Sequence, residues 1–312
     1  MVSVVIPLYN AEPYIERCLN SVINQSYKDW EIVVVDDAST DHSLPIVESY
    51  QKRSTNIRIV KHERNLGLML TRKDGYEAAT GDFIVFLDAD DSLPIDAIIR
   101  LAVKQKQTGA DIVMGNLRKK YVSGKEERRK GYISNDRCAT PMEVLSALLD
   151  ERIIHSLCGK LYRTSLFKQT DLRAFEHLTI AEDACLLYQL VAKASCIASI
   201  NAYTYYYYEN KASASLHAYG LEQIENIIVA YKTIAEACVP YEQLHRKVER
   251  RLTKEVFSLY CERPARDKVR ELLSKHDMLP YGSLNFARKY LGIKDYWFFI
   301  KRFVYCRTMK RS

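Results

Sequence analysis

The segment at residues 83–91 constrains the fold of this chain more than any other. It reads Phe-Ile-Val-Phe-Leu-Asp-Ala-Asp-Asp, so five apolar residues run directly into three carboxylates. An apolar run without a polar break is typical of a strand that is buried on both faces of a sheet. Because aspartate is a poor strand residue, we expect the strand to end where the acids begin. The acids would then lie at the carboxyl end of a central strand, where open α/β sheets bind their ligands.

Three carboxylates this close together need a partner. Asp88, Asp90 and Asp91 would repel one another unless a cation lay between them. A hard divalent ion such as Mg²⁺ or Mn²⁺ takes oxygen ligands, and its remaining positions are commonly filled by phosphate oxygens. The alternative is that Asp91 and Ser92 only cap a helix that opens at Pro94. Capping would explain one of the three acids and leave the other two unexplained. The segment therefore predicts a metal and phosphate site.

The rest of the first third alternates between strand and helix patterns. Short apolar runs followed by turn residues predict strands, and apolar residues at helical spacing between them predict helices. The second strand ends on Asp36 and Asp37, so two pairs of acids should face one crevice. Alternating strands and helices favour a mostly parallel, Rossmann-like α/β sheet flanked by helices. The expected strands are 2–8, 32–35, 57–60, 83–87 and 112–114, and the expected helices lie near 15–23, 46–50, 69–79 and 95–102.

Later segments are less regular. Residues 118–137 carry many charges and predict a hairpin or loop, for which a solvated surface excursion fits as well as a substrate role. Residues 203–208 (Tyr-Thr-Tyr-Tyr-Tyr-Tyr) have high strand propensity. From about residue 218 the pattern is helical and basic: residues 241–312 hold 18 Lys+Arg and 8 Asp+Glu, a balance of +10 in a chain whose net charge is +7. The first 240 residues therefore carry −3, and the asymmetry points to an acidic partner.

Composition bounds the class of protein. A chain of 312 residues with 47% hydrophobic residues is long and apolar enough for one large or two medium domains. We find no signal peptide at the start and no apolar run of the ~20 residues that a membrane span needs. The eight cysteines include no Cys-x-x-Cys pair, which argues against zinc and a disulfide framework and favours the reducing cytoplasm.

The last segment, residues 286–312, holds eight basic residues and one acid. Wound as a helix, residues 296–306 would gather aromatic side chains, including Trp297 and Phe303, mainly on one side. That arrangement predicts peripheral binding to an anionic membrane surface. A terminal helix docked on the core with its basic residues in solvent explains the pattern equally well.

Four motifs in order resemble the family 2 glycosyltransferases of GT-A fold. They are residues 4–10 (Val-Val-Ile-Pro-Leu-Tyr-Asn), 34–39 (Val-Val-Asp-Asp-Ala-Ser), 65–67 (Asn-Leu-Gly) with Arg72, and 86–91 (Phe-Leu-Asp-Ala-Asp-Asp). Residues 160–162 (Lys-Leu-Tyr) and the pair Glu182-Asp183 extend the similarity to about residue 215. The resemblance implies a catalytic domain at 1–215, with a nucleotide-sugar half at about 1–115 and an acceptor half at about 116–215. Residues 216–312 would form a helical, basic extension.

The resemblance also implies an activity: inverting transfer of a sugar from a nucleotide diphosphate donor, usually a UDP-sugar, to a glycan or lipid-linked acceptor. Tyr9 would lie against the base, and Asp37 would accept a hydrogen bond from it. Asp183, with Glu182 as its neighbour, would be the general base at the start of a helix. The remaining expected nucleotide or metal contacts are Pro7, Asn10, Glu12, Arg72 near the phosphates, Asp88 by the ribose and metal, and Asp90 on the Mn²⁺ or Mg²⁺ ion.

The chain departs from the family pattern at two places. Cys158 and Gly159 stand where Trp-Asn is frequent, and Lys73 follows Arg72 where Asn is frequent. Both departures lie near the expected donor and acceptor, so they leave the identity of the sugar open.

Other functions fit less well. A haloacid-dehalogenase-type phosphatase would open with its Asp-x-Asp motif, whereas here a βαβαβ pattern precedes it. A sugar nucleotidyltransferase or a dinucleotide dehydrogenase would need a glycine-rich loop after the first strand, which Leu8-Tyr9-Asn10-Ala11 does not supply. A nucleotide-sugar-binding protein without catalysis remains an alternative. We expect no nucleic-acid partner, because no recognised module accompanies the basic tail.

Overall fold

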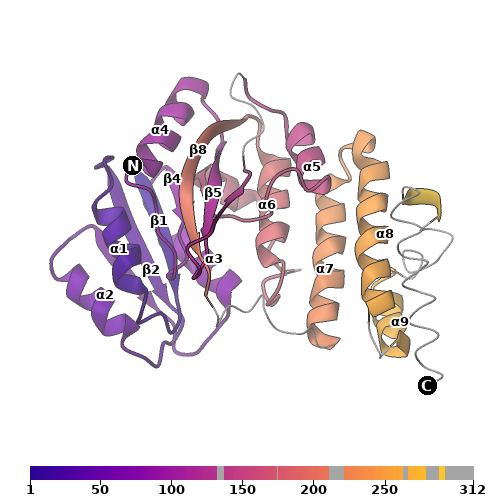
Figure 1. Ribbon diagram of the computed structural model, residues 1–312, viewed down its shortest axis with the longest axis horizontal. Helices are drawn as coiled ribbons and strands as arrows, with labels where there is room; N and C mark the ends of the chain where they lie inside the picture. Colours follow the sequence, from indigo (N-terminus) through magenta and orange to yellow (C-terminus); the bar gives the residue numbers. More distant parts are fainter. Residues whose placement is uncertain (132–136, 174, 211–220, 263–265, 279–287, 292–312) are drawn as a thin grey trace. The chain divides into compact units, whose positions relative to one another are not determined.

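The computed structural model describes residues 1–312 except 132–136, 174, 211–220, 263–265, 279–287 and 292–312 (Figure 1). The chain divides into two compact units, residues 1–216 and 217–312. The predicted interfacial helix at 296–306 lies outside the described residues.

The first unit is built on a mixed eight-stranded sheet with the order β3-β2-β1-β4-β7-β5-β6, in which β8 also pairs with β5. β1 runs parallel to β2 and β4, β2 to β3, and β5 to β8, while β7 and β6 pair antiparallel with their neighbours. The predicted α/β class and GT-A-like sheet are therefore confirmed. The strands are β1 (Val2–Leu8), β2 (Trp30–Asp36), β3 (Ile57–Lys61), β4 (Phe83–Phe86), β5 (Ile112–Lys120), β6 (Glu126–Arg129), β7 (Lys160–Arg163) and β8 (Ile197–Tyr208).

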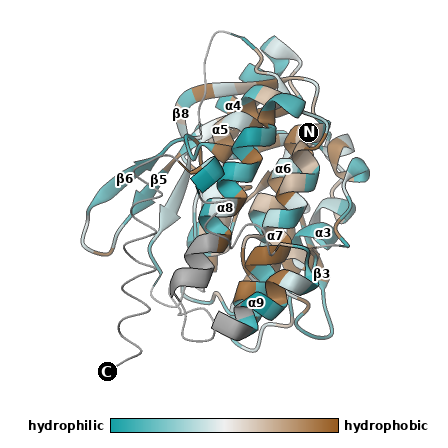
Figure 2. Ribbon diagram, turned by 90° about the vertical axis from the view of Figure 1, so that its right-hand side faces the viewer, coloured by the Kyte–Doolittle hydropathy of each residue, from teal (hydrophilic) through white to brown (hydrophobic). Residues whose placement is uncertain are grey.

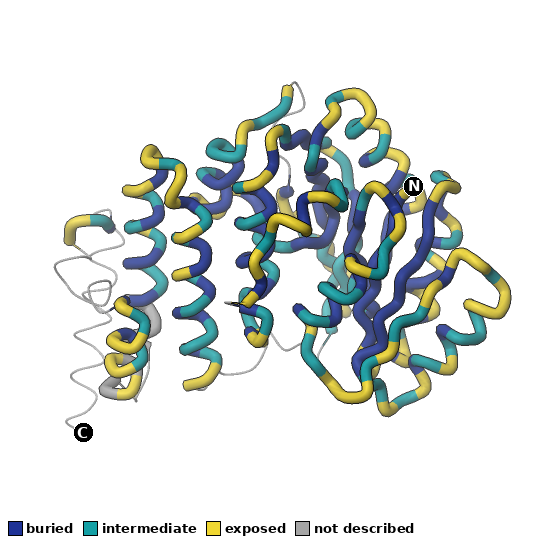
Figure 3. Tube along the Cα trace, turned by 180° about the vertical axis from the view of Figure 1, so that it is seen from behind, coloured by how far each residue is buried: buried dark blue, intermediate teal, exposed yellow. Residues whose placement is uncertain are grey.

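The central strands form the core, as the dark blue segments of Figure 3 show. Every residue of β1 and β2 is buried, in agreement with their mostly apolar sequences, and the buried set includes the polar residues Ser3, Glu31 and Asp36. β2 and β4 lie on either side of β1 and run parallel to it. Leu8, the last residue of β1, is opposite Asp36, the last residue of β2. Because β2 and β4 both run parallel to β1, the acids at their carboxyl ends lie at the same edge of the sheet, as predicted.

Helices follow the strands as the apolar spacing indicates. They are α1 (Ile15–Ile23), α2 (Ser43–Gln51), α3 (Leu68–Ala78), α4 (Ala97–Thr108), α5 (Pro141–Leu149) and α6 (Glu182–Lys193), with a 3₁₀ turn at Thr164–Gln169. α3 approaches the sheet closely because it carries Gly75. A Cβ atom at that position would lie 2.3 Å from Cγ1 of Val5 in β1. Arg72, one turn earlier, is brought against the sheet by the same contact.

The charged segment after residue 118 forms a hairpin, one of the two forms predicted for it. β5 continues to Lys120 and returns antiparallel as β6. β8 lies on the other side of β5, with Arg118 opposite Tyr206 and Lys120 opposite Tyr208.

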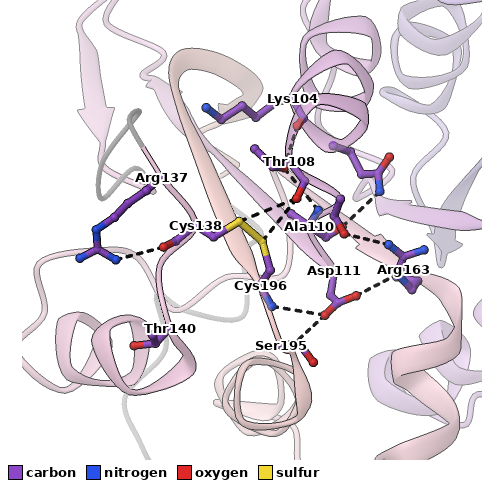
Figure 4. Close-up of a disulfide and its surroundings, with 12 residues drawn as sticks. Lys104, Thr108, Ala110, Asp111, Arg137, Cys138, Thr140, Arg163, Ser195 and Cys196 are labelled. Carbon is purple, nitrogen blue, oxygen red and sulfur yellow. Dashed lines mark hydrogen bonds and ion pairs between the residues drawn. A yellow bond between two sulfur atoms is a disulfide. The ribbon is translucent and has the colours of Figure 1, made fainter.

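The cysteine spacing argued against a disulfide framework, yet the structure contains a disulfide. Cys138 and Cys196 form a disulfide, shown in Figure 4, with 5.4 Å between their Cα atoms. An isolated bridge between Ala139 and Ile197 places the two cysteines side by side. A spacing of 58 residues carried no sign of this contact in the sequence. Cys18, Cys158, Cys185 and Cys238 are buried and form no disulfide.

The described residues of the second unit are helical, as predicted. They form α7 (Leu221–Cys238), a 3₁₀ turn at Glu242–Leu244, α8 (His245–Glu262) and α9 (Arg266–Lys275). In α7, Ile224, Ile227, Ile228 and Ile234 are buried at helical spacing, and the alternation of apolar and polar residues is visible in Figure 2. Within the part of the chain that is described, no helix has the length and apolar character to cross a membrane.

Candidate active site

Asp37, directly after β2, organises the loop between β3 and α3. Its carboxylate accepts hydrogen bonds from the backbone N–H groups of Leu66, at 2.7 Å, and Gly67, at 3.0 Å. The same carboxylate lies 2.7 Å from Nδ1 of His62, whose other nitrogen is 2.9 Å from Asp74. Gly67 has φ of 91°, a conformation that favours glycine. Asp37 therefore fixes the loop that leads into α3.

The turn after β1 is joined to the loop after β2. Asn10, with φ of 48°, accepts a hydrogen bond from the backbone N–H of Thr40 at 2.8 Å. Glu12 accepts one from the backbone N–H of His42 at 3.1 Å. Pro7 is buried inside β1, whereas the Tyr9 side of the turn is open, since Tyr9 is 51% exposed. The structure thus brings the predicted nucleotide residues to one edge of the sheet and leaves an aromatic ring there in contact with solvent.

The three acids after β4 have different surroundings. Asp91 is fully buried, and burial raises its pKa. Its carboxylate accepts hydrogen bonds from the Tyr205 hydroxyl at 2.6 Å and from the Tyr208 backbone N–H at 2.8 Å. It does not cap α4, whose N-cap is Asp96, so the capping alternative was wrong. Asp90 accepts a hydrogen bond from Asn210 at 3.2 Å, and burial, together with the charge of Asp88, raises its pKa.

Arg72 is the cation at the centre of the site. Its side chain is 1% exposed, and its guanidinium donates to Asp88 at 2.8 Å and to Asp183. Glu182 lies 3.5 Å away on the same guanidinium nitrogen that contacts Asp183. Burial opposes the charge on Arg72, yet the carboxylates of Asp183 and Asp88 raise its pKa. One guanidinium thus holds together residues from β4 and α6, which are far apart in the chain.

Asp183 and Glu182 open α6. Ala181, just before them, has φ of 64°, and this left-handed residue turns the chain into the helix. The second oxygen of Asp183 accepts a hydrogen bond from the Leu157 backbone N–H at 3.3 Å. Burial raises the pKa of Asp183, and burial followed by the charge of Asp183 raises that of Glu182 to about 7. A carboxylate with a raised pKa in a buried site is suited to take up a proton.

The loop that supports Asp183 is held by residues whose roles the sequence did not reveal. Lys160 is fully buried, and its ammonium donates to the backbone carbonyls of Ser156 and, at 3.3 Å, Cys158. Burial lowers the pKa of Lys160 to about 8. The Cys158 thiol lies 3.5 Å from Oδ2 of Asp88. Gly159 has φ of 71°, and a Cβ atom there would lie 2.6 Å from Leu117, which explains glycine at this departure from the family pattern.

A model of the glycosyl transferase family 2 matches residues 3–170, more than half of the chain. The chain belongs to glycosyltransferase family 2. The predicted family and enzyme class are thereby confirmed. The match covers the strands that carry Asp37, Asp88 and Asp90, and it ends before Asp183.

Named relatives agree with this family. The glycosyltransferase EpsJ of Bacillus subtilis, described as uncharacterized, is 29% identical over 89% of this chain and 85% of its own length. TarS of Staphylococcus aureus, a poly(ribitol-phosphate) beta-N-acetylglucosaminyltransferase, is 34% identical over 66% of this chain and 35% of its own length. The family 2 chain described here thus spans about a third of TarS.

Solved structures share the fold. A crystal structure of TarS residues 1–349 with UDP-GlcNAc has a TM-score of 0.76 at 22% identity and covers 98% of this chain and 88% of its own. The mannosyltransferase PcManGT of Pyrobaculum calidifontis, with GDP-Man and Mn²⁺, has a TM-score of 0.58 at 17% identity and covers 99% and 86%. At these identities the likeness establishes the fold alone.

The acidic segment of this family 2 enzyme has donors that fit a divalent ion. Asp88 and Asp90 are close enough for the charge of one to raise the pKa of the other. Two carboxylates that repel each other and supply only oxygen atoms are suited to Mg²⁺ or Mn²⁺. Within the described ranges, no group of three or more His, Cys, Asp or Glu residues is arranged to hold a metal by itself. An ion here would keep positions for ligands that the protein does not supply.

Proposed function

We propose that this enzyme is an inverting glycosyltransferase that moves a sugar from a nucleotide diphosphate donor, a UDP-sugar, to a hydroxyl of a glycan or lipid-linked acceptor. The observation that carries the proposal is the Arg72 guanidinium, which contacts Asp88 on one side and Asp183 on the other. Asp88 belongs to the acidic segment expected at the donor phosphates, and Asp183 is the expected base. This arrangement supports a site in which both halves of a sugar transfer meet at one cation.

The nucleotide would bind at the loops after β1 and β2. The exposed ring of Tyr9 offers a face on which a base can stack. Asn10 and Glu12 hold the loop that borders this ring, and buried Pro7 supports it from β1. Asp37 would accept a hydrogen bond from the base while keeping its bonds to the 62–67 loop, because an ionised carboxylate has about four acceptor sites.

Asp88 and Asp90 would hold the divalent ion, which when bound supplies positive charge to the diphosphate leaving group. Arg72 supports the same leaving group with a fixed charge that needs no rearrangement during the reaction. No carboxylic acid has to protonate the departing nucleotide when its charge is already balanced. The protein's own proton transfer is therefore confined to the acceptor side.

Asp183 would take the proton of the acceptor hydroxyl while the oxygen of that hydroxyl attacks the sugar from the face opposite the nucleotide. The hydrogen bond from Leu157 fixes one carboxylate oxygen, and Lys160 fixes the loop that contains Leu157. Glu182 has a pKa of about 7, so its protonation state would partly determine the charge next to Asp183. Before the acceptor arrives, the Asp183–Arg72 pair keeps the base ionised and oriented.

The acceptor we propose is a polymer of the cell envelope. The name of TarS describes transfer onto poly(ribitol phosphate), and this supports a polymer acceptor for the present enzyme. Such transfer would take place in the cytoplasm, at the inner face of the membrane if the acceptor is lipid-linked. Residues 286–312, with eight basic residues, would give a peripheral contact with anionic lipid.

The test is a panel of nucleotide sugars and UDP, measured by thermal shift with and without Mn²⁺, followed by transfer assays with the best donor. A bound donor stabilises the folded state by mass action, so a UDP-sugar should raise the melting temperature more in the presence of the metal. Asp90→Asn should remove that extra stabilisation and nearly abolish transfer while leaving the fold intact. Near-normal turnover and metal dependence in Asp90→Asn would show the metal assignment to be wrong.

A further inference from the structure

A row of cations and tyrosine rings follows β5 and β8 toward the acidic segment. The Arg118 guanidinium lies 4.0 Å from the ring centre of Tyr203, and the Lys120 ammonium lies 4.1 Å from that of Tyr206. The same ammonium is 5.4 Å from the ring of Tyr208, over which the Arg17 guanidinium lies at 3.8 Å. We name the set the cation–tyrosine row: Arg17, Arg118, Lys120, Tyr203, Tyr206 and Tyr208.

The strand register produces the row. β5 and β8 run parallel, with Arg118 opposite Tyr206 and Lys120 opposite Tyr208. Residues two apart on a strand point to the same face, so the two cations repeat along it at about 7 Å. The row therefore presents positive charge at regular spacing rather than as a single patch.

The positive charge of the row is only partly balanced by the protein. Among the described residues, Arg118 is the one cation of the row within salt-bridge distance of a carboxylate, Glu126 at 2.9 Å, while the charge of Arg17 acts on Asp90 from further away. A tyrosine ring attracts a cation and positions it but does not cancel its charge. Residues 118–130 contain seven basic residues and two acids, and β6 with the adjoining end of β5 is coloured as hydrophilic in Figure 2. Lys120, Tyr206 and Tyr208 are half-buried and so retain contact with solvent.

The row ends at the reaction site. Arg17 donates to the backbone carbonyl of Asp90, and the Tyr208 backbone N–H donates to Asp91 at 2.8 Å. The Tyr205 hydroxyl, from the same strand, donates to Asp91 and accepts from the backbone N–H of Asp88 at 3.2 Å. A ligand that lay along the row would therefore have one end beside the acids expected to hold the donor diphosphate.

We infer that the cation–tyrosine row is the binding site for an anionic acceptor, a chain of sugar or polyol units joined by phosphodiesters. The inference rests on the proposed function and adds the chemical class of the acceptor and the surface that binds it. Guanidinium and ammonium groups bind phosphate through charge-assisted hydrogen bonds, and a repeated cation suits a repeated anion. Nucleic acid fits less well, because cations cover ring faces on which bases would stack.

The test uses short poly(ribitol phosphate) oligomers as the probe, titrated by calorimetry in the presence of UDP and Mn²⁺ at low and moderate salt. Lys120→Glu reverses a charge in the row, and Lys106→Glu makes the same change at an exposed position on α4. We expect Lys120→Glu to weaken oligomer binding by roughly tenfold or more, on the scale of a charged hydrogen bond. Lys106→Glu should stay within about twofold, and wild-type binding should weaken as salt rises.

Substitutions of Tyr206 separate positioning by the ring from a general loss of fold. Tyr206→Phe keeps the ring under Lys120 and should retain binding, whereas Tyr206→Ala should lose it while the UDP-induced thermal shift persists. If wild-type protein binds UDP but ignores the oligomer, binds a neutral oligosaccharide equally well, or prefers a single-stranded oligonucleotide, the acceptor inference is overturned and the proposed function stands. If UDP does not bind at all, the proposed function itself fails.

Discussion

The two sides of the site are built in different ways. On the proposed nucleotide side, Asp37 and Asn10 contact loops about one βα unit away, with sequence separations of 29 or 30 residues. On the proposed acceptor side, Arg72 contacts Asp183 across 111 residues, and in the acidic segment next to it Asp91 contacts Tyr205 across 114. The nucleotide side thus follows from the local alternation of strands and helices, whereas the acceptor side exists only when the whole first unit has folded.

The two sides also differ in how charge is held. Asp37 is satisfied mainly by backbone N–H groups, which a rigid loop supplies without a counter-charge. Asp88, Glu182 and Asp183 share the single guanidinium of Arg72. Buried charges are costly unless paired, so loss of one cation should affect the acceptor side more than loss of one hydrogen-bonding group affects the nucleotide side.

The largest effect is expected from Arg72→Met. The change leaves three carboxylates around an apolar side chain, and breaking a buried ion pair costs about 3–5 kcal/mol. Transfer activity should be lost with it. Denaturant unfolding measures the first effect, with Arg72→Lys as the control that keeps the charge but cannot bridge Asp88 and Asp183 as a planar fork does. Full stability in Arg72→Met would mean that the acceptor side does not depend on this cation.

A smaller effect is expected from Asp37→Ala. The change leaves the N–H groups of Leu66 and Gly67 without their acceptor, at a cost of about 1–3 kcal/mol for an unsatisfied buried group. UDP affinity should fall as well, because the 62–67 loop would border the nucleotide in the proposed site. The matched control is Asp82→Ala, at an exposed aspartate before β4. An unchanged UDP affinity in Asp37→Ala would remove this residue from the nucleotide side.

The smallest expected effect is a pH dependence of stability that comes from Glu182 next to the proposed base. The pKa of Glu182 is raised to about 7, so its neutral form is favoured in the folded state. Its stabilising contribution is complete at pH values below its unfolded pKa, near 4.5, and is lost as pH rises through about 7.

Glu182→Gln, which is neutral at every pH, should therefore show a smaller fall in melting temperature between pH 5 and 8 than the wild type, since Asp183, Asp90 and Asp91 also have raised pKa values. Glu77→Gln, on the exposed side of α3, serves as the control and should follow the wild type. Parallel curves for Glu182→Gln and the wild type would show that Glu182 does not titrate in this window.

The fold could be predicted because it depends on short patterns. Apolar runs ending in acids located β2 and β4, and parallel pairing with β1 brought their ends together. The spacing of apolar residues does not indicate which side chains pair over long sequence separations. The hydrogen bonds of Lys160 and Tyr205 and the Cys138–Cys196 disulfide were therefore missed. The dense tyrosine run of 203–208 was a signal for a strand, but it did not indicate that one hydroxyl would hold Asp91.

The proposed roles of the individual site residues are predictions, and Asp183 carries the central one. Its contacts with Arg72 and Leu157 would be the same if it served only to position α6. A measurement that separates acceptor activation from donor binding is needed to decide between the two.

That measurement is the comparison of Asp183→Asn with the wild type in sugar transfer and, in parallel, in UDP affinity. Asparagine keeps the shape of the side chain but cannot take up the acceptor proton. Removing a general base typically costs about 10²–10⁴-fold in rate, so transfer should fall by that factor while UDP affinity stays within about twofold. Transfer close to the wild-type rate, or an equal loss of UDP binding, would contradict the assignment of Asp183 as the base of a glycosyltransferase.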